Sequence, residues 1–125
     1  MAAVPVSGQG DRGLDQPVVL KTRLTEQYNL EIPFVNAGMA FVATAPLATA
    51  ICNAGGLGMI GIAAMSPAVL RAQIGEIRRA TSRPFGVNII ARFSAPEQID
   101  VLVEERVPVV AFFWDEAPAD WIARK

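Results

Sequence analysis

Between Glu31 and Arg71 the chain has no charged residue, although several turn-forming residues interrupt this stretch. A helix that spans a bilayer needs roughly 20 apolar residues in succession, and the pieces here are too short. The alternative is a buried strand, helix and strand, because the strands of a parallel sheet are covered by helices and read as continuous apolar runs. The stretch therefore predicts a buried core. The interrupting residues are Pro46, Asn53, Gly55, Gly56, Gly58 and Gly61.

The composition limits both the partners and the chemistry of the chain. With 125 residues, 52% of them hydrophobic, the sequence is sufficient for one folded domain. A formal net charge of -1 provides no basic surface for nucleic acid and no polybasic segment for an anionic membrane. Histidine is absent, which excludes a histidine general base, a serine–histidine–aspartate arrangement and a histidine metal site. We therefore expect no nucleic-acid partner, no membrane partner and no metal.

The beginning of the chain differs from the rest. Residues 1–19 lack the basic start and apolar segment of a secretory signal, and their Gly, Gln, Asp and Pro content predicts a flexible arm over residues 1–21. Residues 22–125 then form the folded domain. The single cysteine, Cys52, cannot form an internal disulfide, and packing explains it better than chemistry. A cytoplasmic location fits these features.

Apolar segments and helical patterns alternate along the domain. The expected strands are 32–36, 57–62, 85–90 and 107–113, and the expected helices are 22–28, 46–53, 67–80, one that begins at Ser94, and 117–125. This order predicts an α/β fold with a parallel sheet and right-handed crossovers. Two architectures remain open. A small doubly wound domain would be complete with four or five strands, whereas a TIM barrel needs eight strands, so that four βα units are half of it.

In both architectures ligands bind where the strands end. At Gly38 the missing side chain leaves room for a flat cofactor, although a simple turn explains the glycine equally well, and Met39 offers a polarisable contact. Asn88 is the single polar residue of its strand, and a buried amide must be hydrogen-bonded. Its partner is either a neighbouring backbone group or a ligand. The segments that follow the strands are 36–40, 62–64, 88–92 and 114–116.

Two other features are weaker candidates. The run Gly55-Gly56-Leu57-Gly58 precedes a strand, whereas a phosphate loop lies between a strand and a helix, so we expect tight turning and close packing there. Asp115 and Glu116 follow the last strand, where they are either site residues or part of an exposed acidic loop.

Three motifs, in this order and spacing, resemble the nitronate monooxygenase family, formerly called 2-nitropropane dioxygenase and related to the flavin-type enoyl-acyl-carrier-protein reductases. They are Asn36-Ala37-Gly38-Met39-Ala40, Asn53-Ala54-Gly55-Gly56-Leu57-Gly58-Met59-Ile60-Gly61 and Arg83-Pro84-Phe85-Gly86-Val87-Asn88. The resemblance extends from about residue 22 to the end of the chain. It differs at Gly38, where members of the family often have proline, and at Ala45, which precedes Pro46 here.

The resemblance implies an FMN-binding TIM barrel that oxidises alkyl nitronates with O2 to a carbonyl compound and nitrite. It implies that Ala37, Gly38 and Met39 hold the flavin through backbone contacts and that Asn88 hydrogen-bonds it. The family's catalytic histidine belongs to the second half of the barrel, so no catalytic residue is expected up to Lys125.

A half barrel has two unpaired strand edges, which favour pairing with another chain. We therefore expect a truncated family member that is inactive alone, or two copies that close one barrel. A flavin-type enoyl reductase fragment and a non-catalytic binding or assembly piece remain as alternatives.

Overall fold

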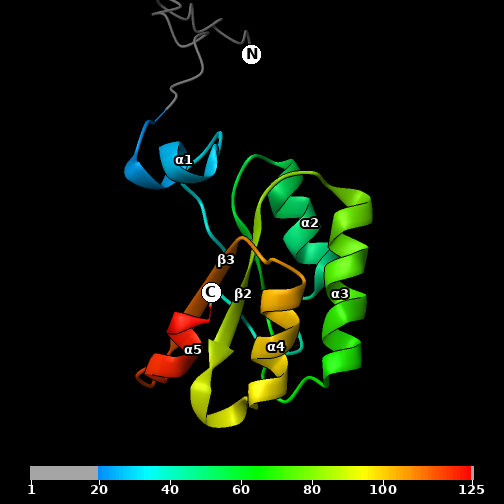
Figure 1. Cartoon of the computed structure of the whole chain (residues 1–125). Helices are drawn as coiled ribbons and strands as arrows, with labels where there is room; N and C mark the ends of the chain where they lie inside the picture. The colour runs from blue at the N-terminus through cyan, green and yellow to red at the C-terminus, as the bar shows by residue number, and fades with distance from the viewer. Residues whose placement is uncertain (1–19, 125) are drawn as a thin grey trace, which may run out of the picture.

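The computed structural model describes residues 20–124, in which helices alternate with parallel strands (Figure 1). The predicted arm lies outside the described residues except for its last two positions. No helix within residues 20–124 is long and apolar enough to cross a membrane. The elements in chain order are α1 (Arg23–Tyr28), α2 (Ala45–Asn53), β1 (Gly58–Gly61), α3 (Pro67–Ala80), β2 (Phe85–Ile90), the short 3-10 helix η1 (Ala91–Phe93), α4 (Pro96–Glu104), β3 (Val109–Phe113) and α5 (Ala119–Ala123).

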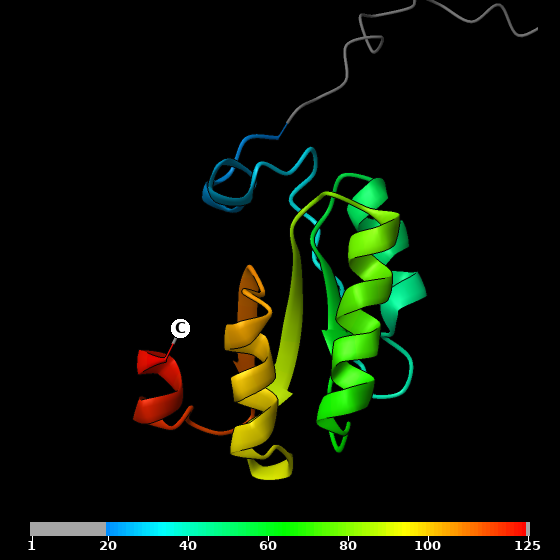
Figure 2. The same cartoon turned by 45° about the vertical axis from the view of Figure 1, so that its right-hand side comes forward.

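The three strands form one parallel sheet in the order β1, β2, β3. Helices α2, α3 and α4 pack side by side in a layer against the sheet, and α1 lies beyond the amino ends of the strands (Figure 2). Strands that are consecutive in sequence are neighbours in the sheet, with α3 in the crossover from β1 to β2 and η1 and α4 in the crossover from β2 to β3. This order agrees with the predicted succession of βα units.

The first predicted strand, 32–36, is not a regular strand. It runs beside β1 in an extended form and makes isolated parallel bridges at Val35–Leu57 and, farther along, Ala40–Gly61. The reason is Asn36, whose side chain accepts a hydrogen bond from the Met59 N–H (2.7 Å) and donates one to the Met59 carbonyl (2.9 Å). A side chain thus occupies the place of the backbone partner in the ladder.

The crossover between β1 and β2 shows how closely local signals can determine an element. Ser66 caps α3 by accepting a hydrogen bond from the Val69 N–H, and Pro67 occupies the first helical position. Leu70, Ile74 and Ile77 recur at helical spacing and are fully buried. Helix α3 has the predicted bounds, 67–80.

Alternating strand residues contribute to two apolar clusters on opposite faces of the sheet. On the helix-covered face, Ile60, Val87 and Ile89 pack with residues of α2, α3 and α4. On the other face, which we call the inner face, Met59 packs with Val109 and Ala111 and with Leu30 and side chains of α1. Helix α1 therefore covers the amino end of the inner face. The remainder of that face has no helix over it in the described chain.

The glycine run before β1 has the structural role predicted for it. Gly55 has φ +93°, a left-handed conformation that suits glycine, and it follows the end of α2. At Gly58 an added Cβ would lie 2.0 Å from the Ala48 backbone oxygen. The glycines allow the turn and the close approach of α2 to β1.

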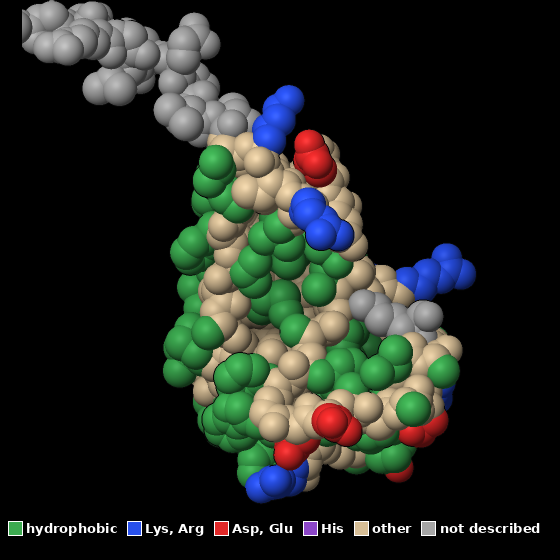
Figure 3. Space-filling view, turned by 90° about the vertical axis from the view of Figure 1, so that its left-hand side faces the viewer, with side chains coloured by type: hydrophobic (Ala, Val, Ile, Leu, Met, Phe, Trp, Pro, Cys, Tyr) green, Lys and Arg blue, Asp and Glu red, His purple; other side chains and the backbone are tan. Residues whose placement is uncertain are grey.

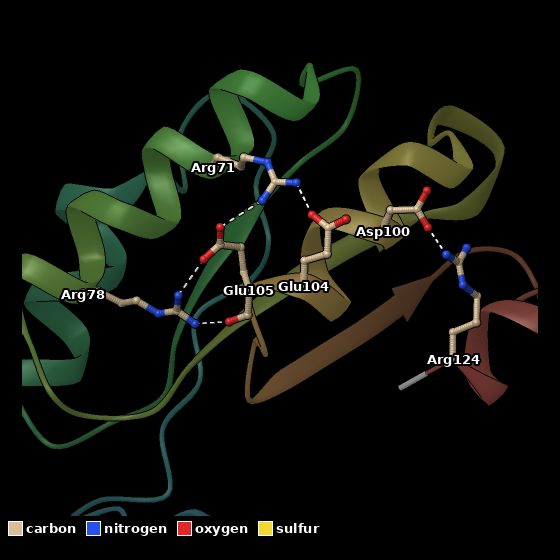
Figure 4. A network of polar contacts seen from close by, with 6 residues as sticks. All are labelled: Arg71, Arg78, Asp100, Glu104, Glu105 and Arg124. Atoms are coloured by element: carbon tan, nitrogen blue, oxygen red, sulfur yellow. Dashed lines mark hydrogen bonds and ion pairs between the residues drawn. The ribbon is translucent and has the colours of Figure 1, made fainter.

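Ion pairs join neighbouring helices on the outside of the molecule (Figure 4). Glu105, at the end of α4, pairs with both Arg71 (3.0 Å) and Arg78 (2.7 Å) of α3, and Glu104 also pairs with Arg71. Farther along, Arg124 pairs with Asp100. These side chains are partly exposed, so the ion pairs orient the helices more than they stabilise the fold.

Candidate functional site

The carboxyl ends of β1 and β2 lie beside the segment 37–40, which bends across them before α2 begins. Gly61 and Asn88 are partners in the register of β1 and β2, and Ala111 of β3 is the next partner. Because these residues share the face on which Met59 and Ala111 pack, Asn88 lies on the inner face. The sheet thus brings Asn88 next to the predicted cofactor ledge, residues 37–39.

Gly38 and Asn88 are in direct contact. A Cβ added at Gly38 would lie 2.1 Å from the Asn88 Cβ, and one added at Gly61 would lie 2.7 Å from the Gly38 carbonyl oxygen. Both glycines are therefore needed to let the ledge pack against the sheet. From the sequence alone, either room for a flat cofactor or a simple turn explains Gly38. The structure adds a third reason for glycine at this position, which is its contact with Asn88.

The Asn88 side chain is half-buried. Its backbone carbonyl accepts a hydrogen bond from the Ile62 N–H (3.2 Å), whereas its side-chain amide has no hydrogen-bond partner within residues 20–124. Of the two partners that the sequence left open, a backbone group or a ligand, the backbone group is therefore not found in the described chain. An amide that is partly removed from water and has no protein partner is suited to bind a polar ligand edge.

The ledge itself is accessible. Ala37 is exposed, and Met39 is 42% exposed. The Met39 N–H donates to the Ala37 carbonyl (2.9 Å), which forms a tight three-residue turn. In this conformation the Met39 N–H is already bonded, and the Met39 carbonyl accepts from the Val42 N–H (3.2 Å) and the Ala43 N–H (2.7 Å), so Met39 would contact a ligand through its thioether side chain.

Just after the ledge, Phe41 has φ 64° and is 85% exposed. Trp114, which follows β3, has φ 71° and is 73% exposed. A left-handed backbone is unfavourable for such residues, and neither ring gains much burial in return. Both aromatic residues lie where strands end, on the same side of the molecule as the ledge.

Gln98 is a functional candidate that the sequence reasoning missed. It is 4% exposed, its Nε2 donates to the Ile62 and Met65 carbonyls, and its Oε1 accepts from the Ala95 N–H (2.8 Å). One side chain thus ties together the loops after β1 and β2. The sequence did contain a signal for its burial. Gln98 precedes the apolar residues Val101 and Leu102 by three and four positions, which places it on the same, buried face of α4.

Those loops border a hollow of about 470 Å³ whose lining includes Met65, Arg92, Phe93 and Ser94. The Ser94 hydroxyl is buried there without a hydrogen-bond partner in the described chain. Arg92 pairs with Asp115 (3.1 Å), which links the loops after β2 and β3. Of the two acidic candidates beyond β3, Asp115 therefore has a structural partner. No three His, Cys, Asp or Glu side chains between residues 20 and 124 are grouped so that they could hold a metal ion.

Cys52 is buried, and its thiol donates to the Pro84 carbonyl (3.3 Å), which agrees with the packing role predicted for it. Burial raises the pKa of this thiol. Because the thiolate is the reactive form, we expect a thiol reagent such as DTNB to label Cys52 slowly in the native protein and rapidly in urea.

The same raised pKa makes stability dependent on pH. The contribution should be complete below the ordinary thiol pKa, where neither state is ionised, and should be lost as the pH rises toward the pKa of the folded state. Urea denaturation at increasing alkaline pH measures this loss. In a Cys52→Ala variant that part of the pH dependence should be absent, and an equal dependence in both proteins would contradict the assignment.

Comparison with known proteins places this geometry in a family. The sequence model named nitronate monooxygenase matches residues 21–112. A nitronate monooxygenase of Paraburkholderia phytofirmans is 40% identical over 86 residues, which are 69% of this chain and 23% of that protein. A (3aS,4S,5R,7aS)-5-hydroxy-7a-methyl-1-oxo-octahydro-1H-indene-4-carboxyl-CoA dehydrogenase of Rhodococcus jostii is 43% identical over 94 residues, 74% of this chain and 27% of the relative.

Among solved structures, FabK from Thermotoga maritima superposes with a TM-score of 0.71 and 47% sequence identity, covering 74% of this chain and 30% of that chain. The chain thus spans less than a third of the length of each of these relatives. The related structures are TIM barrels, which favours the barrel over the doubly wound alternative. The chain belongs to the nitronate monooxygenase family, and its α/β fold is the amino-terminal half of a TIM-type barrel.

Proposed function

We propose that this chain provides part of the FMN site of a flavin-dependent oxidoreductase that oxidises alkyl nitronates with O2 to a carbonyl compound and nitrite. The observation that carries the proposal is the half-buried Asn88 amide, which has no partner in the described chain and lies against the ledge 37–39. Membership of the nitronate monooxygenase family supports it.

The residues present fit a flat ring with polar edges. The Asn88 amide can both donate and accept a hydrogen bond, so it can bind the polar edge of a flavin ring. Ala37 and Met39 expose their surface beside it, and Gly38 holds the ledge against Asn88. When bound, FMN supplies the electron-accepting group of the reaction.

The proton-transfer group of the proposed reaction is not a histidine of this chain. The sequence contains no histidine, and the family resemblance assigns the catalytic histidine to the second half of the barrel. We therefore propose that the described residues bind and orient the flavin and that the 125-residue chain alone has no nitronate oxidase activity.

A second candidate is a flavin-dependent reaction on a thioester, including enoyl reduction. Relatives named FabK and carboxyl-CoA dehydrogenase are 47% and 43% identical to this chain, at least as similar as the nitronate monooxygenase at 40%. Both candidates place the flavin on the same residues and differ in the substrate.

The first test is FMN binding by the purified chain, followed by the quenching of flavin fluorescence. We expect saturable binding and a dissociation constant about fivefold higher in Asn88→Ala, since one lost hydrogen bond is worth roughly 1 kcal/mol. Asn53→Ala is the matched control, because Asn53 is an exposed amide on α2, away from the ledge. Binding that Asn88→Ala leaves unchanged would contradict the role of Asn88.

The two substrate classes are separated by adding propane 2-nitronate or crotonyl-CoA to the flavin-loaded protein. Tighter binding of the nitronate favours nitronate oxidation, and tighter binding of the thioester favours the second candidate. A chain that binds no FMN at all would instead fit a non-catalytic binding or assembly piece.

A further inference from the structure

A second hollow, which we call the Gln73 hollow, lies near the carboxyl end of β1, beside the ledge but separate from it. Its volume is about 490 Å³, within the range of small-molecule sites. Its walls are the loop before α2, the loop after β1 and the first two turns of α3, which are successive parts of the fold. Neither residues 37–39 nor Asn88 lines it. The lining includes Phe41, Thr44, Ala64, Met65, Val69 and Gln73.

Two of the lining residues have a left-handed backbone. Phe41 has φ 64° in the loop before α2, and Ala64 has φ 56° in the loop after β1. This conformation is unfavourable for residues with a Cβ, and such strained residues gather at functional sites. Both loops that form the Gln73 hollow are therefore held in a shape that their own sequences do not favour.

Two polar side chains of the Gln73 hollow have hydrogen-bonding groups that the described chain does not use. Thr44 is the N-cap of α2, but its hydroxyl makes no capping hydrogen bond. Gln73 reaches α2 from α3, and its Oε1 accepts from the Ala45 N–H (2.6 Å). That bond fixes which end of the amide faces α2, and the Nε2 group at the other end has no hydrogen-bond partner within residues 20–124. Both side chains are half-buried, and the bond to Ala45 brings Gln73 close to Thr44.

The rest of the lining is apolar, and no charged side chain of the described chain belongs to it. Exposed apolar side chains alone do not mark a site, since the face seen in Figure 3 is hydrophobic over much of its middle. The Gln73 hollow differs because apolar walls occur together with unpartnered polar groups, the combination found in ligand sites. An ionised ligand group would be buried there without a counter-charge, which favours a neutral ligand.

We propose that the Gln73 hollow binds a neutral acyl compound, that is, a carbonyl group on an apolar chain. The carbonyl oxygen accepts hydrogen bonds from the Thr44 hydroxyl and the Gln73 Nε2 group, both of which can donate. The chain packs against Phe41, Met65 and Val69. Because the ledge and Asn88 lie outside the Gln73 hollow, this site goes beyond the proposed function and does not depend on it.

Titration of the purified chain with methyl hexanoate, followed by heteronuclear NMR, tests the site. The backbone amides of Thr44, Ala64 and Met65 should shift and saturate. Methyl propanoate, which has a shorter chain, should bind about fourfold more weakly for each missing methylene. Hexanoate has the same chain but is ionised, and it should bind at least about tenfold more weakly. Equal affinities for the ester and hexanoate, or shifts that do not saturate, would overturn the proposal.

Gln73→Glu removes the Nε2 donor but keeps an oxygen that can accept from the Ala45 N–H at the start of α2. The dissociation constant of methyl hexanoate should rise by at least about fivefold, because one hydrogen bond is lost. Gln27→Glu is the matched control, since it makes the same chemical change at an exposed position of α1, outside the Gln73 hollow. The control should bind as the unmodified chain does. Equal affinities in the two variants would contradict the role of Gln73.

A second variant keeps the test valid if Gln73→Glu is poorly folded. Thr44→Val replaces the hydroxyl by a methyl group of similar size, and stability in urea should change little because the hydroxyl caps nothing. The affinity for methyl hexanoate should nevertheless fall about fivefold. An unchanged affinity would remove Thr44 from the site and refute the proposed carbonyl contact.

A free ester and an acyl thioester share the proposed chemistry, and S-hexanoyl-N-acetylcysteamine separates them. Tighter binding of this thioester at the same amides would identify the acyl group of a thioester as the ligand, whereas tighter binding of methyl hexanoate would identify a free acyl compound. Either result supports the acyl site. Ester binding by a chain that binds no FMN would contradict the proposed function alone, and FMN binding without ester binding would contradict the acyl site alone.

Discussion

Replacing Gly58 by alanine should destabilise the protein by about 3 kcal/mol, at the upper end of what overpacking of a core costs. An alanine Cβ at this position would lie 2.0 Å from the Ala48 backbone oxygen and 2.8 Å from the Ala48 Cα. The contacts are backbone atoms of α2, so no side-chain rotation can relieve them. The helix would have to move away from β1, which would loosen the packing of Ala45 and Cys52 as well.

The measurement is the free energy of unfolding in urea, followed by circular dichroism. Gly75→Ala is the matched control, since it makes the same chemical change inside α3, where the added Cβ meets only the Arg79 side chain at 3.4 Å. That variant should be more stable by about 0.5 to 1 kcal/mol, because glycine is unfavourable inside a helix. Opposite signs for the two substitutions are the expected result, and two losses of similar size would refute the packing argument.

Replacing Asn36 by alanine should cost about 2 to 4 kcal/mol of unfolding free energy, because two backbone groups lose their partners. The Met59 N–H and carbonyl are bonded to the Asn36 side chain, and Met59 is 4% exposed, so water cannot easily replace the lost contacts. Asn36 also donates to the Ala37 carbonyl (2.9 Å), so the ledge should become more mobile.

Hydrogen exchange separates this effect from a general loss of stability. The Met59 amide should exchange much faster in Asn36→Ala, while amides of β2 change only in proportion to global stability. Asn53→Ala serves as the control here too, because its one bond, to the Ala80 carbonyl, is long (3.5 Å) and exposed. If Asn36→Ala and Asn53→Ala were equally stable, the side chain of Asn36 would not be the partner that β1 requires.

The elements best predicted from sequence were those whose signals are local. Helix α3 has a serine cap, a proline at its first position and a regular apolar face, and β2 is an apolar segment with Asn88 as its single polar residue; both were predicted with the observed bounds. The first strand was not, because no periodic pattern reveals that an asparagine side chain replaces backbone partners.

The candidate site was predictable only in part. The rule that ligands bind where strands end selected Asn88 and residues 37–39, which the structure brings together. The contact between Gly38 and Asn88 could not be foreseen, since it depends on how far the ledge bends over the sheet. Gln98 was missed because a glutamine beside Glu97 at the start of a helix reads as solvent-facing.

The ion pairs between successive βα units bear on how a chain of this kind could gain a further unit. Between the helices and the loops after the strands, the pairs join a unit to its immediate successor: Arg71 and Arg78 on α3 reach Glu105 next to α4, and Arg92 after β2 reaches Asp115 after β3. The Arg83–Glu31 pair, at the amino ends of the strands, is the exception within residues 20–124, because it reaches past β1. None within residues 20–124 connects the two ends of the series. A βα unit added by gene duplication would thus need compatible charges only toward its predecessor, and could extend the fold without disturbing any earlier pair.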